Sequence, residues 1–267
     1  MVIDVRWGSA THHGRVRDHN EDALLAGPDV FAVADGMGGH AGGEVASAMA
    51  VAALAELADL PGAWDPAQEV RTALERINGE IRRRSEADQA LTGMGTTVAG
   101  VARIAGARLL VFNLGDSRVY RLRAGQLVQL TEDHSVVGEL VRAGELTEDE
   151  ARRHPHRNVV TRALGAEVGV EPVLAIVAVE VGDCFLAATD GLFDVLSAAR
   201  IRAVLGDPSS VERRARALLE AARDRGAPDD VSVVVVVVDG TSGSDGLDID
   251  IDTSPGRSAP TDRRASV

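Results

Sequence analysis

Segments typical of β-strands follow one another along this chain more often than they alternate with helices. A doubly wound parallel sheet would require strict alternation of strands and helices, so this order predicts antiparallel sheets instead. Ala124-Gly125 predicts a hairpin turn between two of the strands. The nine expected strands, rich in β-branched residues and bordered by glycine or turn residues, are 2–7, 30–34, 96–104, 108–114, 119–123, 127–130, 175–179, 184–188 and 231–238.

Two pairs of amphipathic helices are expected between these strands. Apolar residues recur at spacings of three and four over 44–60 and 66–84, and again over 198–205 and 211–223. Each pair has one apolar face to bury, and a sheet offers the complementary surface. The pattern therefore predicts an α+β protein in which helices cover antiparallel sheets.

The chain of 267 residues is 45% apolar, which is enough to build a substantial core. We expect one catalytic domain over 1–239 and a disordered tail over 240–267, where Ser, Gly, Asp, Pro and Arg dominate. The acidic stretch 245–252 of this tail either binds a basic partner or only keeps the chain soluble. Within the domain, the charged segment 136–164 predicts an inserted lobe, with a capped helix starting at Thr147.

Charge and composition exclude several classes of function. With 41 acidic and 28 basic side chains the net charge is -13, so we expect no nucleic-acid partner. All the basic residues are arginine, which excludes Schiff-base, pyridoxal and P-loop chemistry because each needs a lysine. The one cysteine, Cys184, indicates a buried thiol in a reducing compartment. The chain has no apolar stretch long enough for a secretory signal or a membrane span, so we expect a cytoplasmic protein that is not bound to a membrane.

Aspartates stand at the ends of the expected strands. Asp35, Asp116 and Asp190 each follow an apolar strand, whereas Asp229 comes just before the strand 231–238. In antiparallel sheets the end of one strand lies beside the start of its neighbour, so all four carboxylates could meet on one rim. Any single one of them is also explained as an ordinary turn residue.

Glu21 and Asp22 could add two more carboxylates to this rim. Carboxylates held so close repel one another unless some are protonated or a cation binds between them. All the candidate ligands are oxygen donors, without a Cys or His cluster, so Mg²⁺ or Mn²⁺ fits better than Zn²⁺. The sequence therefore predicts a site for hard divalent cations.

Two further residues suit phosphate chemistry. Arg17 could bind phosphate oxygens bidentately, and His40, after Gly38-Gly39, could protonate a leaving alkoxide. Taken alone, Arg17 is better explained as a surface arginine and His40 as an exposed loop histidine. The sequence has no Gly-x-Ser-x-Gly motif and no Cys-His pair, so nothing supports a covalent serine or cysteine route.

Seven motifs in register, from about Gly8 to Val238, resemble those of the metal-dependent protein phosphatase 2C family of bacterial type. They are RDHNED at 17–22, FAVADGMGGH at 31–40, GTT at 95–97, NLGDSR at 113–118, TRALG at 161–165, TDGL at 189–192 and DDVS at 229–232. The resemblance implies a four-layer α-β-β-α sandwich of two antiparallel sheets with a helical pair outside each. It also implies two Mn²⁺ or Mg²⁺ ions in a cleft at the sheet ends, with a possible third.

The resemblance also implies roles for single residues. By these motifs Arg17 corresponds to the phosphate-binding arginine, His40 to the general acid, and Asp22 to a carboxylate that orients a metal-bound water. The family usually has Asp-Asn before the last strand, whereas here Asp230 follows Asp229, so either of the two could be the ligand. The implied metal ligands are Asp35 as the bridge, Glu21 and the Gly36 carbonyl on one ion, Asp190 and Asp229 on the other, and Asp116 with Asp190 on the third.

The implied function is hydrolysis of phosphoserine and phosphothreonine in proteins by a hydroxide that bridges the two metals. Such an enzyme would form no phosphoenzyme and would oppose a serine/threonine protein kinase; we also expect a monomer. The segment 136–164 corresponds to the mobile flap of the family. Three alternatives stay open: a phosphatase for a dedicated regulatory partner such as an anti-sigma-factor antagonist, a non-catalytic pseudophosphatase that only binds, and a small-molecule phosphomonoesterase.

Overall fold

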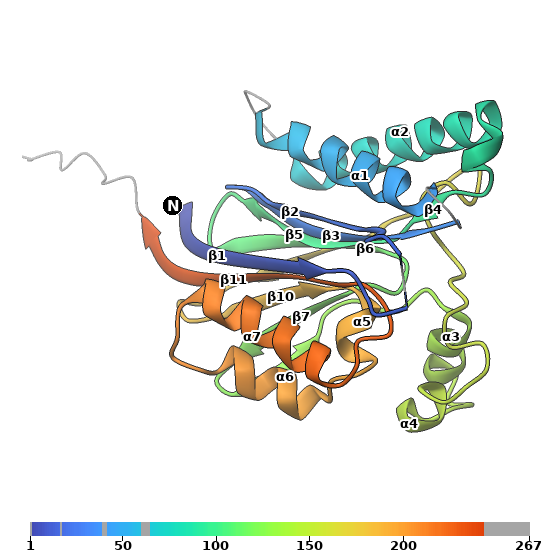
Figure 1. The fold of residues 1–267 in the computed structure, drawn as a ribbon. Coiled ribbons are helices and arrows are strands. Elements are labelled where there is room, and N and C mark those ends of the chain that lie inside the picture. The colour runs from blue at the N-terminus through green and yellow to red at the C-terminus, as the bar shows by residue number, and fades with distance from the viewer. Residues whose placement is uncertain (1, 17, 39–41, 60–64, 243–267) are drawn as a thin grey trace, which may run out of the picture.

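The computed structural model describes residues 2–16, 18–38, 42–59 and 65–242. Two antiparallel sheets lie face to face, and helices cover the outer face of each (Figure 1). The expected α+β sandwich is confirmed. Most of the expected tail lies outside the described residues, but its first residues continue the last strand, which ends at Ser242.

Each sheet has its own strand order, and all the pairs are antiparallel. Sheet A runs β1 (Val2–His12), β11 (Val231–Ser242), β10 (Cys184–Ala188), β7 (Arg118–Arg123), β8 (Gln126–Gln129). Sheet B runs β2 (Asp22–Ala26), β3 (Val30–Met37), β5 (Val98–Ile104), β6 (Arg108–Leu114), β9 (Val173–Ala178), with β4 (Gly95–Thr96) also paired to β3.

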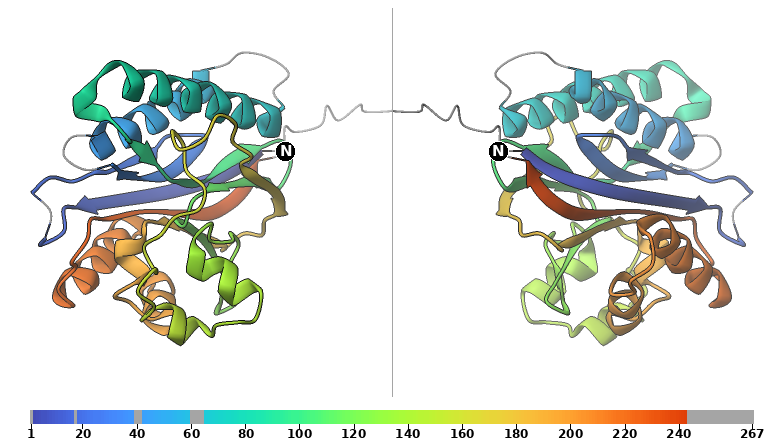
Figure 2. Two further views of the ribbon diagram at one scale, coloured as in Figure 1. Left: turned by 90° about the vertical axis from the view of Figure 1, so that its right-hand side faces the viewer. Right: turned by 90° about the vertical axis from the view of Figure 1, so that its left-hand side faces the viewer.

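The helices fall into three groups. Sheet B is covered by α1 (Gly42–Ala55) and α2 (Pro66–Ala87), with 3₁₀ turns at Glu56–Asp59 and Gln89–Leu91. Sheet A is covered by α5 (Asp190–Phe193), α6 (Ala198–Leu205) and α7 (Val211–Asp224). The flap carries α3 (Val136–Arg142) and α4 (Glu148–Ala151), which stand beside the sandwich (Figures 1 and 2).

The valine run of β11 shows how the layers are held together. Val233, Val235 and Val237 pack against the helices on sheet A, whereas Val234 and Val236 pack between the two sheets. Because successive side chains of a strand point to opposite faces, a strand that is buried on both faces has no polar position. This explains the unbroken run of β-branched residues.

Strand β1 is longer than its local sequence indicates. It continues from the expected end at Trp7 to His12, because it pairs along its whole length with β11. Gly8 lies in the middle of the strand, where a Cβ atom would come within 2.6 Å of the Glu212 backbone of α7. The missing side chain therefore lets α7 lie directly on the sheet.

Local turn and cap chemistry is as the sequence indicates at several places. Ala124 and Gly125 both have positive φ, 48° and 76°, in the two-residue turn between β7 and β8. Thr147 caps α4 together with Glu150 in a complete capping box. Helix α6 has the expected bounds. None of the helices in the described ranges combines the length and the apolar character needed to cross a membrane.

Candidate metal centre

The aspartates singled out in the sequence come together at one end of the two sheets. Asp22 and Asp35 are direct partners in the β2–β3 ladder. Asp190 opens α5 immediately after β10, and Asp229 stands two residues before β11, the neighbour of β10. The antiparallel pairing thus puts the end of β10 beside the start of β11.

The carboxylates at this end of the sheets influence one another's ionisation. Burial raises the pKa of Asp35 well above its usual value, and the charges of Asp22, Asp190, Asp116 and Asp229 raise it further. The pKa of Asp190 is also raised well above normal, first by burial and then by the charges of Asp116, Asp194, Asp229 and Asp22. We call Asp22, Asp35, Asp116, Asp190 and Asp229 the carboxylate cluster.

Two members of the cluster have pKa values near neutrality. Burial is the main cause that raises the pKa of Asp22 to about 7, and the hydroxyl groups of Ser232 and Thr189 oppose this rise. Burial also raises the pKa of Asp116 to about 7, with a further contribution from the charge of Asp133. The fold therefore holds several carboxylates where ionisation is unfavourable without a positive partner.

The donor set of the cluster fits hard divalent cations. Among the described residues, the buried atoms Asp22 Oδ1 and Asp190 Oδ1 have no hydrogen-bond partner, so both are available as ligands. All the donors are oxygens, the type that Mg²⁺ and Mn²⁺ prefer. In the described ranges no three Asp, Glu, His or Cys side chains are placed so that they could hold a metal ion together, so the cluster shares burial and charge but not a ligating geometry.

Glu21 reaches this end of the sheets through close backbone contacts. Its carbonyl oxygen accepts hydrogen bonds from Gly36 N–H (3.1 Å) and from the Ser47 hydroxyl (2.6 Å). A Cβ atom at Gly36 would lie 2.2 Å from the Gly43 carbonyl oxygen, and one at Gly43 would lie 2.8 Å from Glu21 Oε1. Only glycine at these two positions allows β3, the start of α1 and Glu21 to approach so closely.

Asp229 and Asp230 have different surroundings. The carboxylate of Asp230 is buried and accepts backbone hydrogen bonds from Gly14 N–H (2.8 Å) and Glu21 N–H (2.7 Å). Asp229 instead raises the pKa values of Asp35 and Asp190 by its charge. Asp230 thus ties two loops together, although its charge also raises the pKa of Asp22. Asp229 is the one of the pair that acts on both Asp35 and Asp190.

Thr189 is a polar contact of the cluster that sequence reasoning missed. Its hydroxyl donates to Asp22 Oδ2 (2.9 Å) and accepts from Ser232 N–H (2.9 Å). It therefore fixes the orientation of Asp22 from the end of β10. Thr189 lies inside the TDGL motif, but only the three-dimensional pairing reveals its partner.

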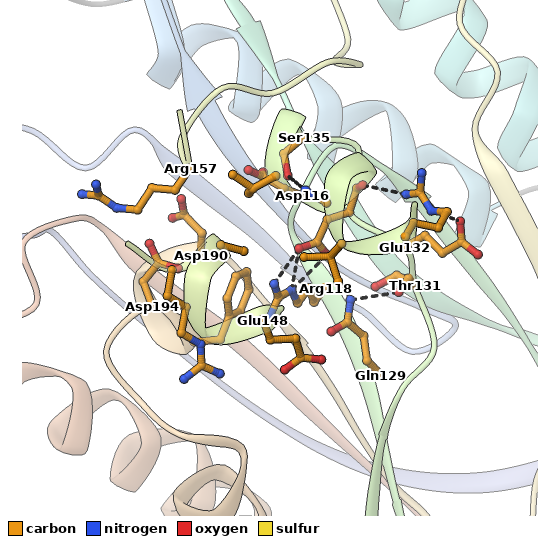
Figure 3. Close-up of a pocket in the computed structure, with 18 residues that line it drawn as sticks. Asp116, Arg118, Gln129, Thr131, Glu132, Ser135, Glu148, Arg157, Asp190 and Asp194 are labelled. Atoms are coloured by element: carbon orange, nitrogen blue, oxygen red, sulfur yellow. Dashed lines mark hydrogen bonds and ion pairs between the residues drawn. The ribbon is translucent and has the colours of Figure 1, made fainter. Parts of the chain in front are cut away.

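A cavity of about 350 Å³ lies between the cluster, the flap and α5 (Figure 3). Asp116 and Asp190 form part of its wall, so the cavity opens onto the candidate metal centre. Apolar side chains of the flap and of α5 form another part. The residues lining it are Asp116, Arg118, Gln129, Thr131, Glu132, Asp133, Ser135, Val137, Gly138, Val141, Arg142, Glu148, Ala151, Arg152, Arg157, Asp190, Phe193 and Asp194.

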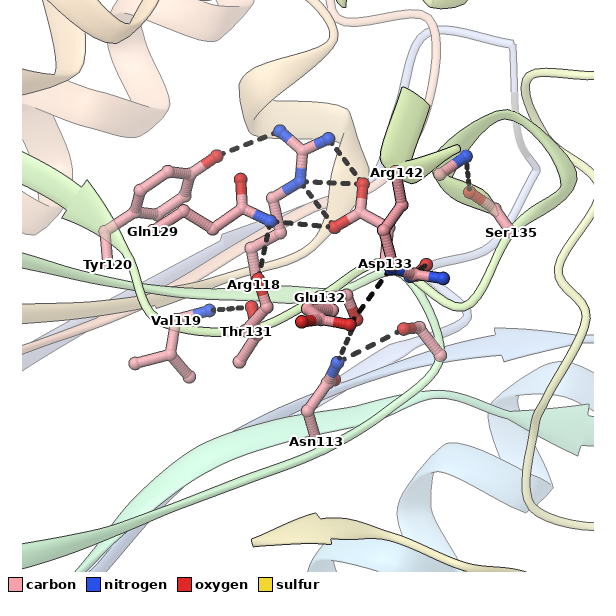
Figure 4. Close-up of polar contacts among 12 residues, drawn as sticks. Asn113, Arg118, Val119, Tyr120, Gln129, Thr131, Glu132, Asp133, Ser135 and Arg142 are labelled. Atoms are coloured by element: carbon pink, nitrogen blue, oxygen red, sulfur yellow. Dashed lines mark hydrogen bonds and ion pairs between the residues drawn. The ribbon is translucent and has the colours of Figure 1, made fainter. Parts of the chain in front are cut away.

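Arg118 connects the wall of this cavity to the base of the flap (Figure 4). Its guanidinium donates to both carboxylate oxygens of Asp133 (2.5–3.0 Å) and to the Tyr120 hydroxyl (3.0 Å). The same group lies 3.8 Å from the ring centre of Phe193 in α5. Sequence reasoning gave Arg118 no role of its own.

Arg17 and His40 lie outside the described residues. Their assignments therefore stay predictions from the sequence motifs. The remaining predicted residues all belong to the segments that meet at this end of the sheets. They are Glu21, Asp35, Gly36, Asp116, Asp190 and Asp229.

Comparison with known proteins bears on both sequence and structure. The Protein phosphatase 2C family profile matches residues 10–231. Serine/threonine protein phosphatase PstP of Mycobacterium tuberculosis is 41% identical over 239 residues, which cover 89% of this chain and 46% of PstP. Serine/threonine phosphatase stp of Listeria monocytogenes is 38% identical over 235 residues, covering 85% of this chain and 93% of that protein. The chain thus spans about half the length of PstP and nearly all of the Listeria relative.

Solved structures give the same relationship. A crystal structure of the M. tuberculosis phosphatase PstP superposes with a TM-score of 0.83 at 41% identity, covering 88% of this chain and 99% of that one. The catalytic domain of PstP in complex with two manganese ions superposes with a TM-score of 0.82 at 40% identity, covering 90% of this chain and 100% of that domain. The fold, the carboxylate cluster and the extent of these matches lead to one conclusion: this chain is a member of the protein phosphatase 2C family of bacterial serine/threonine phosphatases.

Proposed function

We propose that this protein hydrolyses phosphoserine and phosphothreonine in proteins with the help of divalent cations. The observation that carries the proposal is the carboxylate cluster, mostly half-buried at one end of a protein phosphatase 2C fold, in which the pKa values of Asp22, Asp35, Asp116 and Asp190 are raised. Ionised carboxylates clustered in this way destabilise the folded state unless positive charge is bound among them. Two manganese ions in the PstP catalytic domain support the same chemistry.

The proposed ligand set is the one implied by the family motifs, and the charges around each carboxylate support it. Asp35 is the carboxylate that four other members surround electrostatically, which suits a bridge between two ions. Glu21 and the Gly36 carbonyl would hold one ion, and Asp190 with Asp229 the other. Asp116, whose charge raises the pKa of Asp190, would hold a third ion together with it.

The chain's own residues bind and orient the substrate. When bound, the cations supply the Lewis acidity that activates water and neutralises charge on the phosphoryl group. Arg17 would bind the phosphate oxygens, and His40 would donate a proton to the departing serine or threonine oxygen. The Thr189 hydroxyl keeps Asp22 turned toward this site. The cavity beneath the flap offers room for peptide residues next to the phosphorylated one.

The decisive experiment is hydrolysis of a phosphothreonine peptide in the presence of Mn²⁺, for the wild type and for Asp35→Asn. We expect both a chelator and the substitution to abolish turnover, since each removes the bridged cation pair. The matched control is Asp224→Asn, which changes an exposed carboxylate on α7 and should leave turnover unchanged. Full turnover by Asp35→Asn would contradict the proposed ligand set.

The substrate class is tested by comparing a phosphopeptide with small phosphate esters. A protein phosphatase should prefer the phosphopeptide in kcat/KM, whereas a small-molecule phosphomonoesterase would not. A pseudophosphatase would bind the phosphopeptide without turning it over. The role of His40 is tested by His40→Ala, which should slow esters with poor leaving groups more than activated aryl phosphates.

The reaction itself indicates which kind of enzyme would act in the opposite direction. Phosphoserine and phosphothreonine in proteins are products of protein kinases, so the enzyme would oppose a serine/threonine kinase. A dedicated regulatory phosphoprotein is the alternative substrate. Hydrolysis of one phosphoprotein, with no turnover of the others in a panel, would identify it. Cytoplasmic location and a monomeric state stay predictions.

A further inference from the structure

Strand β9 (Val173–Ala178) is the last strand of sheet B, and among the described residues only β6 pairs with it. Such an edge strand presents a row of backbone N–H and C=O groups to which another strand can bond. All six of its residues are apolar, and Val173 and Ile176 are 42% and 55% exposed. No charged residue, proline or register shift interrupts these six residues. The edge of sheet B is therefore open to pairing.

Two other edge strands of the sandwich are protected against such pairing. Strand β1 carries the charged residues Asp4 and Arg6, and its register shifts between Asp4 and Val5. Strand β8 has only four residues, two of which are glutamine. Charges, bulges and short length are common means by which proteins block the edges of sheets. Strand β9 has none of these features, which is typical of an edge that a partner strand covers.

The pairing with β6 determines which backbone groups of β9 point outward. Val179 N–H donates to the Ala107 carbonyl oxygen (3.0 Å), and these two residues continue the register of the β6–β9 ladder by one pair. In an antiparallel ladder, pairs with and without hydrogen bonds alternate along the strand. The odd-numbered residues of β9 therefore bond to β6. The even-numbered residues present their N–H and C=O groups at the open edge, and they are Leu174, Ile176 and Ala178.

One of these outward groups already has a partner. The Ala178 carbonyl oxygen accepts a hydrogen bond from the guanidinium of Arg123 on β7 (3.0 Å). At the other end of the strand, Pro172 directly precedes β9 and has no N–H to donate. A partner strand therefore fits this edge when it needs neither the Ala178 carbonyl oxygen nor a donor at Pro172.

We propose that two copies of this chain associate through antiparallel pairing of their β9 strands, with the two-fold axis at Ala175. In this register Leu174 of each copy exchanges two hydrogen bonds with Ile176 of the other. Pro172 lies opposite Ala178 of the second copy, so the missing donor meets the acceptor that is already filled. The Ala178 N–H donates to the Pro172 carbonyl oxygen across the interface. The edge of sheet B is thus complementary to itself.

The side chains also match in this register. Ala175 lies opposite Ala175 of the second copy in a pair without hydrogen bonds, where Cα atoms are only about 4.5 Å apart, so a small side chain fits. On the same face of the sheet Val173 lies opposite Val177, and on the other face Leu174 lies opposite Ile176. Every one of these side chains is apolar, so pairing removes exposed apolar surface from water.

The association should be reversible, because a single pair of strands forms a small interface and small interfaces are weak. We expect a monomer, as the family resemblance implies, at low concentration and a dimer as the concentration rises. Sedimentation velocity of the full chain from micromolar to millimolar concentration measures this equilibrium. The mass of a single chain throughout that range would overturn the proposal.

Ile176→Lys tests whether β9 is the contact. Its exposed position allows the folded monomer to accept lysine, whereas the dimer would hold two ammonium groups close to the axis on an apolar surface. The dissociation constant should rise by at least about tenfold. The matched control is Val16→Lys, which changes a side chain that is 76% exposed between β1 and β2, at the opposite edge of the sandwich. It should leave the dissociation constant unchanged, and equal weakening by both variants would overturn the proposal. Circular dichroism shows that each variant is folded.

Disulfide cross-linking tests the register. Ala175→Cys places two thiols opposite each other across the axis, with a Cα separation inside the range of about 4.4–6.8 Å that disulfides accept. Ile176→Cys is the matched control, because its two copies are diagonal neighbours about 7–8 Å apart. The native Cys184 is only 2% exposed and does not compete. Ala175→Cys should form a covalent dimer about tenfold faster than Ile176→Cys in mild oxidant.

Equal rates of cross-linking, or a faster rate for Ile176→Cys, would overturn the pairing about Ala175. None of these measurements depends on the proposed phosphatase reaction, so the dimer and the enzyme activity are tested separately.

Discussion

Neighbouring aspartates in this chain have different functions because their side chains meet different partners. Asp230 accepts two backbone hydrogen bonds that hold the loops at Gly14 and Glu21, and Asp229 faces the carboxylate cluster. One position in the sequence thus separates a structural carboxylate from a candidate ligand. The same distinction can be measured by mutation.

Asp230→Ala should destabilise the fold. It leaves the buried N–H groups of Gly14 and Glu21 without an acceptor, at a cost of about 2 kcal/mol or more in the free energy of unfolding. Asp230→Asn keeps one oxygen acceptor and should lose about half as much. Urea denaturation measures both. Equal stability of Asp230→Ala and the wild type would refute this role.

Asp35→Asn should raise the stability of the metal-free protein while it abolishes activity. The substitution removes a carboxyl group whose ionisation is disfavoured by burial and by the charges of four other carboxylates. We expect a higher Tm for chelator-treated Asp35→Asn than for the chelator-treated wild type at pH 7.5. A lower Tm would mean that the cluster does not strain the fold.

The raised pKa values predict how the stability of the metal-free protein depends on pH. Asp22 and Asp116 have folded pKa values of about 7, compared with an ordinary value of 3.8. Between these values the folded state holds more protons than the unfolded state, so the free energy of unfolding falls as pH rises. The contribution of these groups should therefore decrease from pH 5 to pH 8. Denaturation of chelator-treated protein across this range tests the sign.

At the scale of elements, Arg118 links three parts of the molecule. It lies on β7, its salt bridge holds Asp133 just before α3 of the flap, and its guanidinium stacks on Phe193 of α5, the helix that begins with Asp190. The position of the flap and the position of a candidate ligand are thus coupled through one side chain. A loss of Arg118 should affect both.

Arg118→Gln should destabilise the protein by about 3 kcal/mol, because it leaves Asp133 partly buried without its partner. It should also raise KM for a phosphopeptide more than for a small aryl phosphate, since the flap borders the peptide side of the cavity. Arg142→Gln, whose pair with Glu132 is exposed, is the matched control and should cost less than about 1 kcal/mol. Equal losses of stability and equal changes of KM in the two variants would contradict this role of Arg118.

At the scale of the whole molecule, cation binding should determine stability. A ligand that binds only the folded state stabilises it by about 2.7 kcal/mol at a concentration of 100 Kd. We expect Mn²⁺ to raise Tm more at pH 7.5 than at pH 5.5, because protons compete for the same carboxylates. Differential scanning calorimetry with and without chelator measures this. A Tm independent of Mn²⁺ at pH 7.5 would contradict the metal centre.

Much of the fold could be predicted from the sequence because it depends on local patterns. The valine run, the helix pairs and the Ala124-Gly125 turn each carry a periodicity or a turn preference of their own. Long-range contacts determine the rest. Strand β1 extends to His12 only because β11 lies beside it. Strand β2, which was not among the nine expected strands, is likewise held by its pairing with β3.

The candidate site likewise contains some features that depend on local sequence and others that depend on long-range contacts. Strand-end aspartates could be found from their positions after apolar runs, and antiparallel pairing indicated a common rim. The hydrogen bonds of Asp230 and Thr189 could not be predicted, because their partners are more than forty residues away in sequence. The short helix α5 depends on Gly191, where a Cβ atom would lie 2.0 Å from the Asp230 carbonyl oxygen.

The pairing of the first and last strands has one more consequence. Val2 lies opposite Ser242 in the β1–β11 ladder, so the two ends of the described domain are neighbours at one end of sheet A. A short glycine-rich connector could therefore join them without disturbing either sheet. New termini could then be opened in the surface turn at Ala124-Gly125, and such a circularly permuted enzyme should retain its fold and its cation dependence.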